Sequence, residues 1–464
     1  MEALTASSEG PMAGGPMVNS MSTSGNLPDP ETEQQNGISA DEIALYDRQI
    51  RLWGVKAQER IRSAKVLLVT VKAIGAEIAK NLILNGIGSL TIIDNGQVID
   101  NDLGAQYFLR DEDIGLNRAQ AASTRLQELN PRVAVIPDIS DVTTKGPDFY
   151  SSFDMIIATD LPFFSLSLIN AAARMAKRPF YATGIHGFYG FIFADLIEHE
   201  YIIEREQSNR STAVTSESTT RSIISVATKK ENGKNIELVT KREAYTPIIL
   251  ANSSPLAPEY LKNRRRLKGV TPLLPALRAL WDFERNTGRF PTHSREDLVS
   301  FTTLANEKLQ ELQLPVDTLK SDFLRSFMQN VGSEIVPTAA FVGGRLSEDA
   351  INVLGKREQP IQNLLLFDGE NFQAPIYALH PIFEENGTAQ QLPPAPPVDA
   401  GTMPQGNVDR PQGVNGGSTV SQNELSTMPS APVGASQAQE TSDHAGAGAA
   451  TGGVVEANGE IDLS

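Results

Sequence analysis

The feature that most constrains the fold is an alternation of short apolar runs with longer helix-forming stretches between residues 66 and 195. The runs predicted as strands are VLLVTV (66–71), LTIID (90–94), VAVI (133–136), MIIAT (155–159), FYAT (180–183) and FIFAD (191–195). The stretches predicted as helices are 76–84, 117–129 and 165–177. Strands that are apolar throughout are buried on both faces, and intervening helices supply right-handed crossovers. The pattern therefore predicts an α/β, Rossmann-like, mostly parallel sheet.

One helix is predicted just before this alternation, from Ser39 to Trp53. Ser39 followed by Glu42 is a capping-box pattern, and Gly54 is a stop signal. A short second helix is expected over 57–61. The apolar residues of the first helix recur at steps of three and four, and they are Ile43, Tyr46, Ile50 and Trp53.

The apolar pattern weakens after residue 203, where a polar, Ser/Thr-rich stretch begins. Helices are predicted again at 272–283, 294–312 and 334–354, and a last strand, LLLFDG, at 364–369. We interpret this as an α/β domain interrupted by an inserted domain, with disordered termini. The expected regions are a tail at 1–38, the first part of the α/β domain at 39–203, the insertion at 204–325, the completion of the domain at 326–383, and an acidic tail at 384–464.

Composition excludes several classes of protein. The sequence has no cysteine, which excludes disulfides, a thiolate zinc site and a cysteine nucleophile. No signal peptide or long apolar span is evident, so we expect a soluble intracellular protein with no membrane partner. Most of the net charge of −16 falls in the two tails, and basic residues are not interleaved with aromatic ones, so nucleic-acid binding is not expected.

The turn after the first strand is where a dinucleotide-binding fold carries its glycine loop. Aligning G-x-G-x-x-G with this turn places Thr70, Lys72 and Gly75 at the three glycine positions. Asp94, 19 residues after Gly75, lies near the spacing expected of a ribose-binding acid. Either Lys72 contacts phosphate in an unusual working site, or the architecture persists without the ligand. The loss of two glycines favours the second interpretation, with Gly75 packing helix on strand and Asp94 holding backbone amides.

Longer motifs resemble the activating enzymes of ubiquitin-like proteins, a ThiF-like family. The motifs that carry the resemblance are YDRQIRLWG (46–54), the segment 66–94, GAQYFL (104–109), IGLNRAQAA (114–122), GFYGFIFADLIEHEY (187–201) and AAFVGGRLSEDAINVL (339–354). The resemblance is closest to the smaller, non-cysteine subunits of SUMO-activating heterodimers. It covers about 41–203 and 325–383.

The resemblance also implies which half of the family's paired domains this chain represents. The ATP-using half carries a full glycine loop, an Asn/Arg pair and a Lys, whereas Asp102, Ala105 and Arg118 stand at the last three positions here. Asp160 does match an acid of the active half. The resemblance therefore implies an inactive half with vestigial Gly75, Asp94 and Asp160 and with no cofactor or metal of its own.

By the same resemblance, Arg48 of the YDRQ motif is expected to reach across the dimer to the partner's triphosphate and act there in catalysis. The alternative is a surface ion pair with Asp47 or another helix carboxylate. The implied partner is a larger, cysteine-bearing subunit that binds ATP and Mg²⁺, adenylates the SUMO C-terminus and recruits the conjugating enzyme. Localisation in the nucleus, or in both the nucleus and the cytoplasm, is expected, and LKNRRRLK (261–268) is either an import signal or a solvated helix.

Other interpretations stay open at this point. They are the inactive subunit of the neddylation-pathway heterodimer, a nicotinamide-dependent Rossmann oxidoreductase, and a scaffold without catalytic contribution. Two further residues have structural explanations. His186 is expected to be a buried hydrogen-bonding histidine rather than a metal ligand, and Gly343-Gly344 is expected to allow close helix packing.

Overall fold

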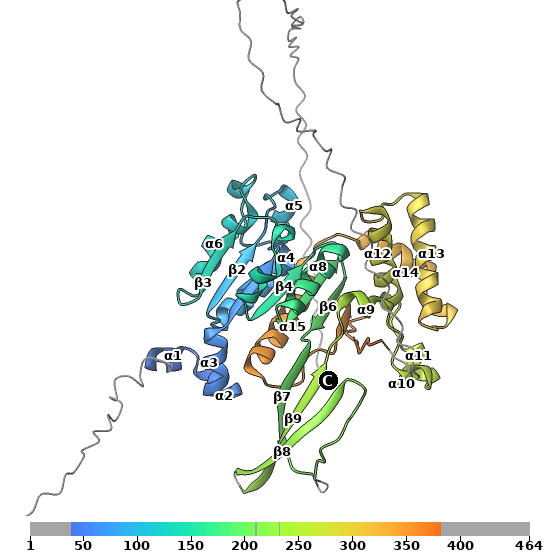
Figure 1. Cartoon of the computed structure of the whole chain (residues 1–464). Helices are drawn as coiled ribbons and strands as arrows, with labels where there is room; N and C mark the ends of the chain where they lie inside the picture. The colour runs from blue at the N-terminus through green and yellow to red at the C-terminus, as the bar shows by residue number, and fades with distance from the viewer. Residues whose placement is uncertain (1–38, 209–210, 232, 382–464) are drawn as a thin grey trace, which may run out of the picture. The chain divides into compact units, whose positions relative to one another are not determined.

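The protein is described here from a computed structural model, which covers residues 39–208, 211–231 and 233–381 (Figure 1). Both predicted tails, 1–38 and 384–464, lie outside the described residues. Within the described part of the chain, no helix combines the length and the apolar character needed to cross a membrane.

The central element is an eight-stranded sheet with the order β11-β10-β6-β5-β4-β1-β2-β3. Its strands are β1 (Lys65–Val69), β2 (Ser89–Ile93), β3 (Ala134–Asp138), β4 (Met155–Thr159), β5 (Phe180–His186), β6 (Tyr189–Asp195), β10 (Leu364–Asp368) and β11 (Ile376–Tyr377). Strands β1 to β5 pair in parallel, which confirms the predicted mostly parallel sheet. Every residue of β4 and β5 is buried, as expected of strands covered on both faces.

One edge of this sheet is antiparallel, which the alternation of strands and helices did not predict for 191–195. Strand β6 pairs antiparallel with β5 and with β10, and β10 pairs antiparallel with β11. Only Gly187 and Phe188 separate β5 from β6, which allows a hairpin but no crossover. Gly187 has a φ of +60°, a conformation that glycine adopts without strain.

Helices cover both faces of the sheet and enclose two apolar cores. The helices of the α/β part are α4 (Ala73–Leu84), α5 (Asp100–Leu103), α6 (Arg118–Leu129), α7 (Pro147–Ser151), α8 (Phe163–Met175) and α15 (Val336–Gly355), with short 3₁₀ turns η2 (Asp111–Asp113) and η3 (Val142–Thr144). Along β1, alternate residues enter opposite cores, with Leu67 and Val69 on the α8 side and Val66 and Leu68 on the α4 side. Of the predicted Gly343-Gly344 pair, Gly343 confirms the close packing, because a Cβ there would lie 2.8 Å from Cβ of Glu77 on α4, whereas a Cβ on Gly344 would meet nothing within 4 Å.

The predicted helix from Ser39 to Trp53 is divided in two. The segments are α1 (Ala40–Leu45) and α2 (Asp47–Trp53), and α3 (Val55–Ser63) follows. The predicted capping box forms, with Ser39 and Glu42 bonded to each other's backbone amides. Tyr46 lies at the break with φ −101° and ψ 17°, and its buried hydroxyl accepts a hydrogen bond from Asn130 at 2.8 Å. We attribute the break to this inward turn, which the apolar spacing alone could not reveal.

Between β6 and α15 the chain forms a second, antiparallel sheet and a set of helices. The sheet has the order β7-β9-β8, and its strands are β7 (Glu198–Glu206), β8 (Arg221–Glu231) and β9 (Lys234–Ala244). The helices are α9 (Ile248–Ser253), α10 (Pro258–Leu261), α11 (Arg264–Lys268), α12 (Leu273–Thr287), α13 (Arg295–Glu311) and α14 (Ser321–Asn330), with the 3₁₀ turn η4 (Val316–Thr318). Trp281 of α12 stacks on Phe163 of α8, so this part is packed against the central sheet's helices.

Candidate functional site

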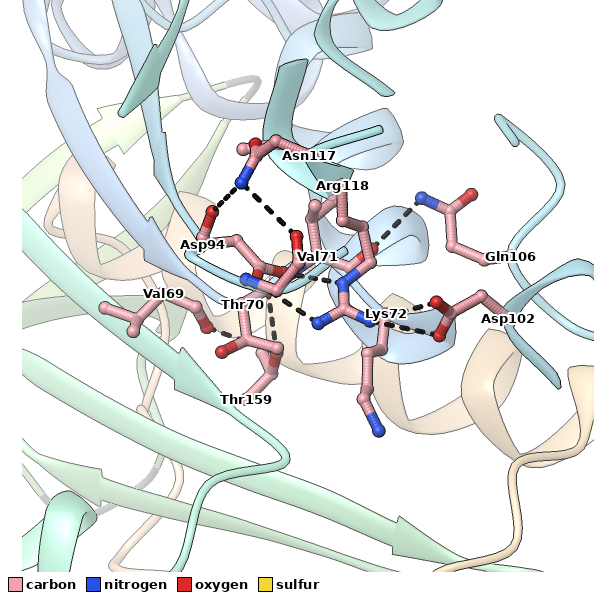
Figure 2. Close-up of polar contacts among 12 residues, drawn as sticks. Val69, Thr70, Val71, Lys72, Asp94, Asp102, Gln106, Asn117, Arg118 and Thr159 are labelled. Carbon is pink, nitrogen blue, oxygen red and sulfur yellow. Dashed lines mark hydrogen bonds and ion pairs between the residues drawn. The ribbon is translucent and has the colours of Figure 1, made fainter. Parts of the chain in front are cut away.

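The turn between β1 and α4 is a degenerate phosphate loop (Figure 2). Thr70, at the first glycine position, has a φ of +70°, a conformation that costs a residue with a Cβ about 1–2 kcal/mol. Its amide bonds the carbonyl of Ile93 at 2.9 Å, and its carbonyl accepts from the Thr159 hydroxyl at 2.9 Å. The turn thus keeps the backbone conformation of a glycine loop, and hydrogen bonds to the neighbouring strands β2 and β4 hold it. Thr70 places a side chain at a position that is glycine in a nucleotide-binding loop.

Gly75, at the third glycine position, has the predicted packing role. A Cβ on Gly75 would lie 2.5 Å from the carbonyl oxygen of Thr70 and 3.3 Å from the hydroxyl of Thr159. Real Cβ atoms essentially never approach backbone so closely. Glycine is therefore required for α4 to lie against the end of β1 and β4, whether or not a ligand binds.

A carboxylate from far along the chain occupies the N-terminus of α4. Glu334 Oε2 accepts a hydrogen bond from the amide of Ala73 at 3.0 Å, and Oε1 lies 3.1 Å from Nζ of Lys72. Burial lowers the pKa of Lys72, but the nearby charges of Glu334 and Asp160 outweigh burial, so the pKa is raised. Glu334 is 261 residues from Ala73 and has no motif around it, so sequence reasoning missed it.

Asp94 at the end of β2 is fully used within the chain. Its Oδ2 accepts from the amide of Val71 at 3.0 Å and its Oδ1 from the amide of Gly96 at 2.8 Å, as predicted for a residue that holds backbone amides. Arg118 of α6 also pairs with Asp94 at 2.8 Å and with Asp102 at 3.0 Å. Figure 2 shows the guanidinium between the two carboxylates. Sequence reasoning named both Asp102 and Arg118 but not their pairing.

The electrostatics of this cluster favour the charged guanidinium of Arg118. Burial lowers the pKa of Arg118, but the hydrogen bonds and charges of Asp94 and Asp102 raise it overall. All three side chains are buried, so few water molecules compete with the pairing. A Cβ on Gly96 would lie 2.2 Å from Nη2 of Arg118, which shows how tightly the guanidinium fills this space.

Asp160 follows β4 and lies near Glu334 in the described structure. Its φ is +49°, and its Oδ1 accepts from the amide of Ile185 at 3.2 Å, while Oδ2 is buried with no hydrogen-bond partner among the described residues. Burial, and then the charge of Glu334, raise the pKa of Asp160 to about 7. Asp160 and Glu334 line a small cavity of about 60 Å³ together with Lys72.

His186 lines the same cavity and has the predicted structural role. Its Nδ1 accepts a hydrogen bond from the amide of Gly332 at 3.2 Å, and burial lowers its pKa to about 4. Among the described residues, no three histidine, aspartate or glutamate side chains are grouped so that they could hold a metal ion.

These residues do not fit a nucleotide triphosphate bound by this chain. A phosphate at the N-terminus of α4 would meet the carboxylate of Glu334, and a ribose hydroxyl at Asp94 would have to displace Arg118. Lys72 stands at the second glycine position, where the backbone must approach the phosphates and a side chain obstructs that approach. The cradle formed by the β1–α4 turn and Asp94 is therefore occupied by the chain's own Glu334 and Arg118 and does not fit a nucleotide.

Arg48 lies on α2, a helix with no buried residue. Its side chain is exposed, and no residue in the described ranges forms a hydrogen bond or ion pair with it. Asp47, the alternative partner expected from the sequence, pairs instead with Arg51 at 3.0 Å. No polar contact within the described structure joins Arg48 to Gly75, Asp94 or Asp160, so its guanidinium is available to a group outside this chain.

Comparison with known proteins gives a consistent family. The model of the ThiF family matches residues 46–387. The DNA damage tolerance protein RHC31 of Saccharomyces cerevisiae is 38% identical over 346 residues, which cover 73% of this chain and 97% of that protein. The DNA damage tolerance protein rad31 of Schizosaccharomyces pombe is 35% identical, covering 74% and 99%. SUMO-activating enzyme subunit 1 of Homo sapiens is 34% identical, covering 75% and 98%.

Proposed function

The chain belongs to the ThiF family, and from that premise we propose that it is the regulatory, non-thiol subunit of a heterodimeric SUMO-activating enzyme. The observation that carries the proposal is the cradle filled by the chain's own Glu334 and Arg118. A chain with this cradle and without any cysteine needs another subunit both for adenylation and for a thioester.

We accordingly assign adenylation and thioester formation to the larger subunit. In this proposal it binds ATP and Mg²⁺, adenylates the C-terminus of SUMO, forms the thioester on its cysteine and recruits the conjugating enzyme. The present chain pairs with it and supports the adenylation step, in the nucleus or in both the nucleus and the cytoplasm. The names of the relatives favour this pathway over the neddylation pathway, and the blocked cradle disfavours a nicotinamide-dependent oxidoreductase.

We assign to Arg48 a direct contribution to the partner's reaction. Adenylation develops negative charge on the departing pyrophosphate, and a guanidinium held in place stabilises that charge. The exposed position of Arg48 and the absence of a partner for it within the described residues support this role. Arg51, one turn further along α2, is paired with Asp47 and has no such freedom.

The test is pyrophosphate exchange by the heterodimer reconstituted from this chain and the larger subunit. Arg48→Ala is expected to slow exchange by about 10²-fold, the effect of removing one charge-stabilising donor. Arg51→Ala is the matched control, because it removes the same exposed charge from the same helix and should leave the rate nearly unchanged. Gel filtration of each variant establishes that the dimer still forms. An unchanged rate for Arg48→Ala would leave the chain as a scaffold without catalytic contribution.

A further inference from the structure

The carboxylate of Glu334 contacts a helix-terminal amide and an ammonium group, the same groups that bind an anion at a helix N-terminus. We propose that the N-terminus of α4, together with Lys72, is an intact anion site whose permanent ligand is the carboxylate of Glu334. The N-terminus of α4 is then closed to free anions by an internal competitor. This inference concerns a binding site of the chain itself and does not depend on Arg48 or on the partner subunit.

The components of an anion site are all present at this position. Helix α4 has 12 residues, its N-cap residue Lys72 makes no side-chain cap, and its first turn contains no acidic residue of its own. The positive end of the helix dipole and the ammonium group of Lys72 therefore require a negative partner from elsewhere. Glu334 meets both, one carboxylate oxygen on the amide of Ala73 and the other on Lys72.

The two residues before Glu334 are hydrogen-bonded to the β5–β6 hairpin, which positions the carboxylate. The amide of Gly332 donates to His186, and the carbonyl of Ser333 accepts from the amide of Gly187 at 2.8 Å. A carboxylate tethered in this way competes with free anions at a high effective concentration. A ligand in solution would have to exceed that concentration to displace it.

The surrounding charges oppose a free anion at this position. Asp160 lies close enough to Glu334 for their charges to repel, and Glu284 lines the same cavity. The attraction for a carboxylate therefore comes from the amide of Ala73 and the ammonium group of Lys72, the two groups that contact Glu334. The cavity's other titratable residue is His186, which burial keeps neutral at physiological pH. Arg118 adds positive charge at longer range.

The experiment is chemical rescue of the full chain, with formate and inorganic phosphate as probes. Glu334→Ala removes the internal ligand and should lower the thermal unfolding midpoint by about 2–4 °C, as expected for the loss of one charged cap. Formate or phosphate should then restore the midpoint in a saturable manner, whereas chloride at equal ionic strength should not. Wild type should show no saturable response to either probe.

Three further variants make the result decisive. Glu348→Ala removes an exposed carboxylate that pairs with Arg345 and should show no rescue. Adding Lys72→Met to Glu334→Ala should abolish the rescue, because half of the positive source is lost. Glu334→Gln, which keeps the size of the side chain and can still accept from Ala73, provides a folded variant if Glu334→Ala does not fold, and it should respond to the anions more weakly. The proposal is overturned if folded Glu334 variants respond to formate and phosphate no more than wild type, or if Lys72→Met leaves the response intact.

Discussion

The buried cluster around Arg118 allows a quantitative prediction. Arg118, Asp94 and Asp102 are exposed by only 7%, 5% and 5%, and the guanidinium bonds both oxygens of each carboxylate. Arg118→Ala leaves two buried carboxylates without a countercharge, and breaking a buried pair in this way costs about 3–5 kcal/mol. Asp94 keeps its hydrogen bonds from Val71 and Gly96, which offset part of that loss. We therefore expect a loss of unfolding free energy of about 3 kcal/mol, at the lower end of that range.

The assay is urea unfolding of the full chain, followed by far-ultraviolet circular dichroism. A compensated variant, in which Arg118→Met is combined with Asp102→Asn, should recover part of the stability, because the one carboxylate left without a countercharge, Asp94, keeps its hydrogen bonds from the amides of Val71 and Gly96. Arg242→Ala is the surface control, since Arg242 pairs with Glu200 at half-exposed positions and its loss should leave the urea midpoint nearly unchanged. If Arg118→Ala were as mild as Arg242→Ala, the guanidinium would not be neutralising the cradle.

Two other perturbations test neighbouring parts of the cradle. The folded-state pKa of Asp160, about 7, lies above its ordinary value of 3.8, so the folded chain binds an extra proton between these values and its stability should fall as the pH rises from about 4 to about 7. Asp160→Asn should flatten that slope, which is at most about 1.4 kcal/mol per pH unit for one proton, and identical urea midpoint profiles for the variant and wild type would contradict the assignment. Gly75→Ala should lower stability by about 1–3 kcal/mol, because its Cβ would press on the carbonyl of Thr70; a thermal midpoint equal to that of wild type would disprove the close packing.

The sequence predicted the strands of the central sheet to within a few residues, except the two-residue edge strand β11, because strands buried on both faces have a strong apolar signal. It did not predict the antiparallel direction of β6, which depends on a two-residue hairpin, or the break at Tyr46, which depends on a hydrogen bond to a distant asparagine. The periodicity of apolar residues indicates which face of a segment is buried. The direction of β6 and the break at Tyr46 leave that face unchanged, so periodicity does not predict them.

The cradle shows the same division between local and distant information. Thr70 and Gly75 could be interpreted from the sequence, because a glycine position is defined by its neighbours along the chain. Glu334 could not, because its role is set by a contact with a residue 261 positions away and no motif surrounds it in the sequence. The prediction that Asp94 holds backbone amides was confirmed, but the second function of Asp94, pairing with Arg118, required coordinates.

The charges of the cradle explain why the loss of glycines is an incomplete account of this site. A binding site for a charged ligand contains a helix N-terminus, whose free amides are stabilised by an anion, and a carboxylate, which is stabilised by a hydrogen-bond donor. Both groups remain unsatisfied when no ligand is bound. In this chain Glu334 supplies the anion and Arg118 supplies the donor. Glu334 and Arg118 each stabilise the fold and at the same time obstruct a nucleotide in the cradle. Restoring glycine at Thr70 and Lys72 would therefore reopen the backbone of the turn and remove the ion pair between Lys72 and Glu334, but it would leave Arg118 on Asp94 and the hydrogen bond from the amide of Ala73 to Glu334.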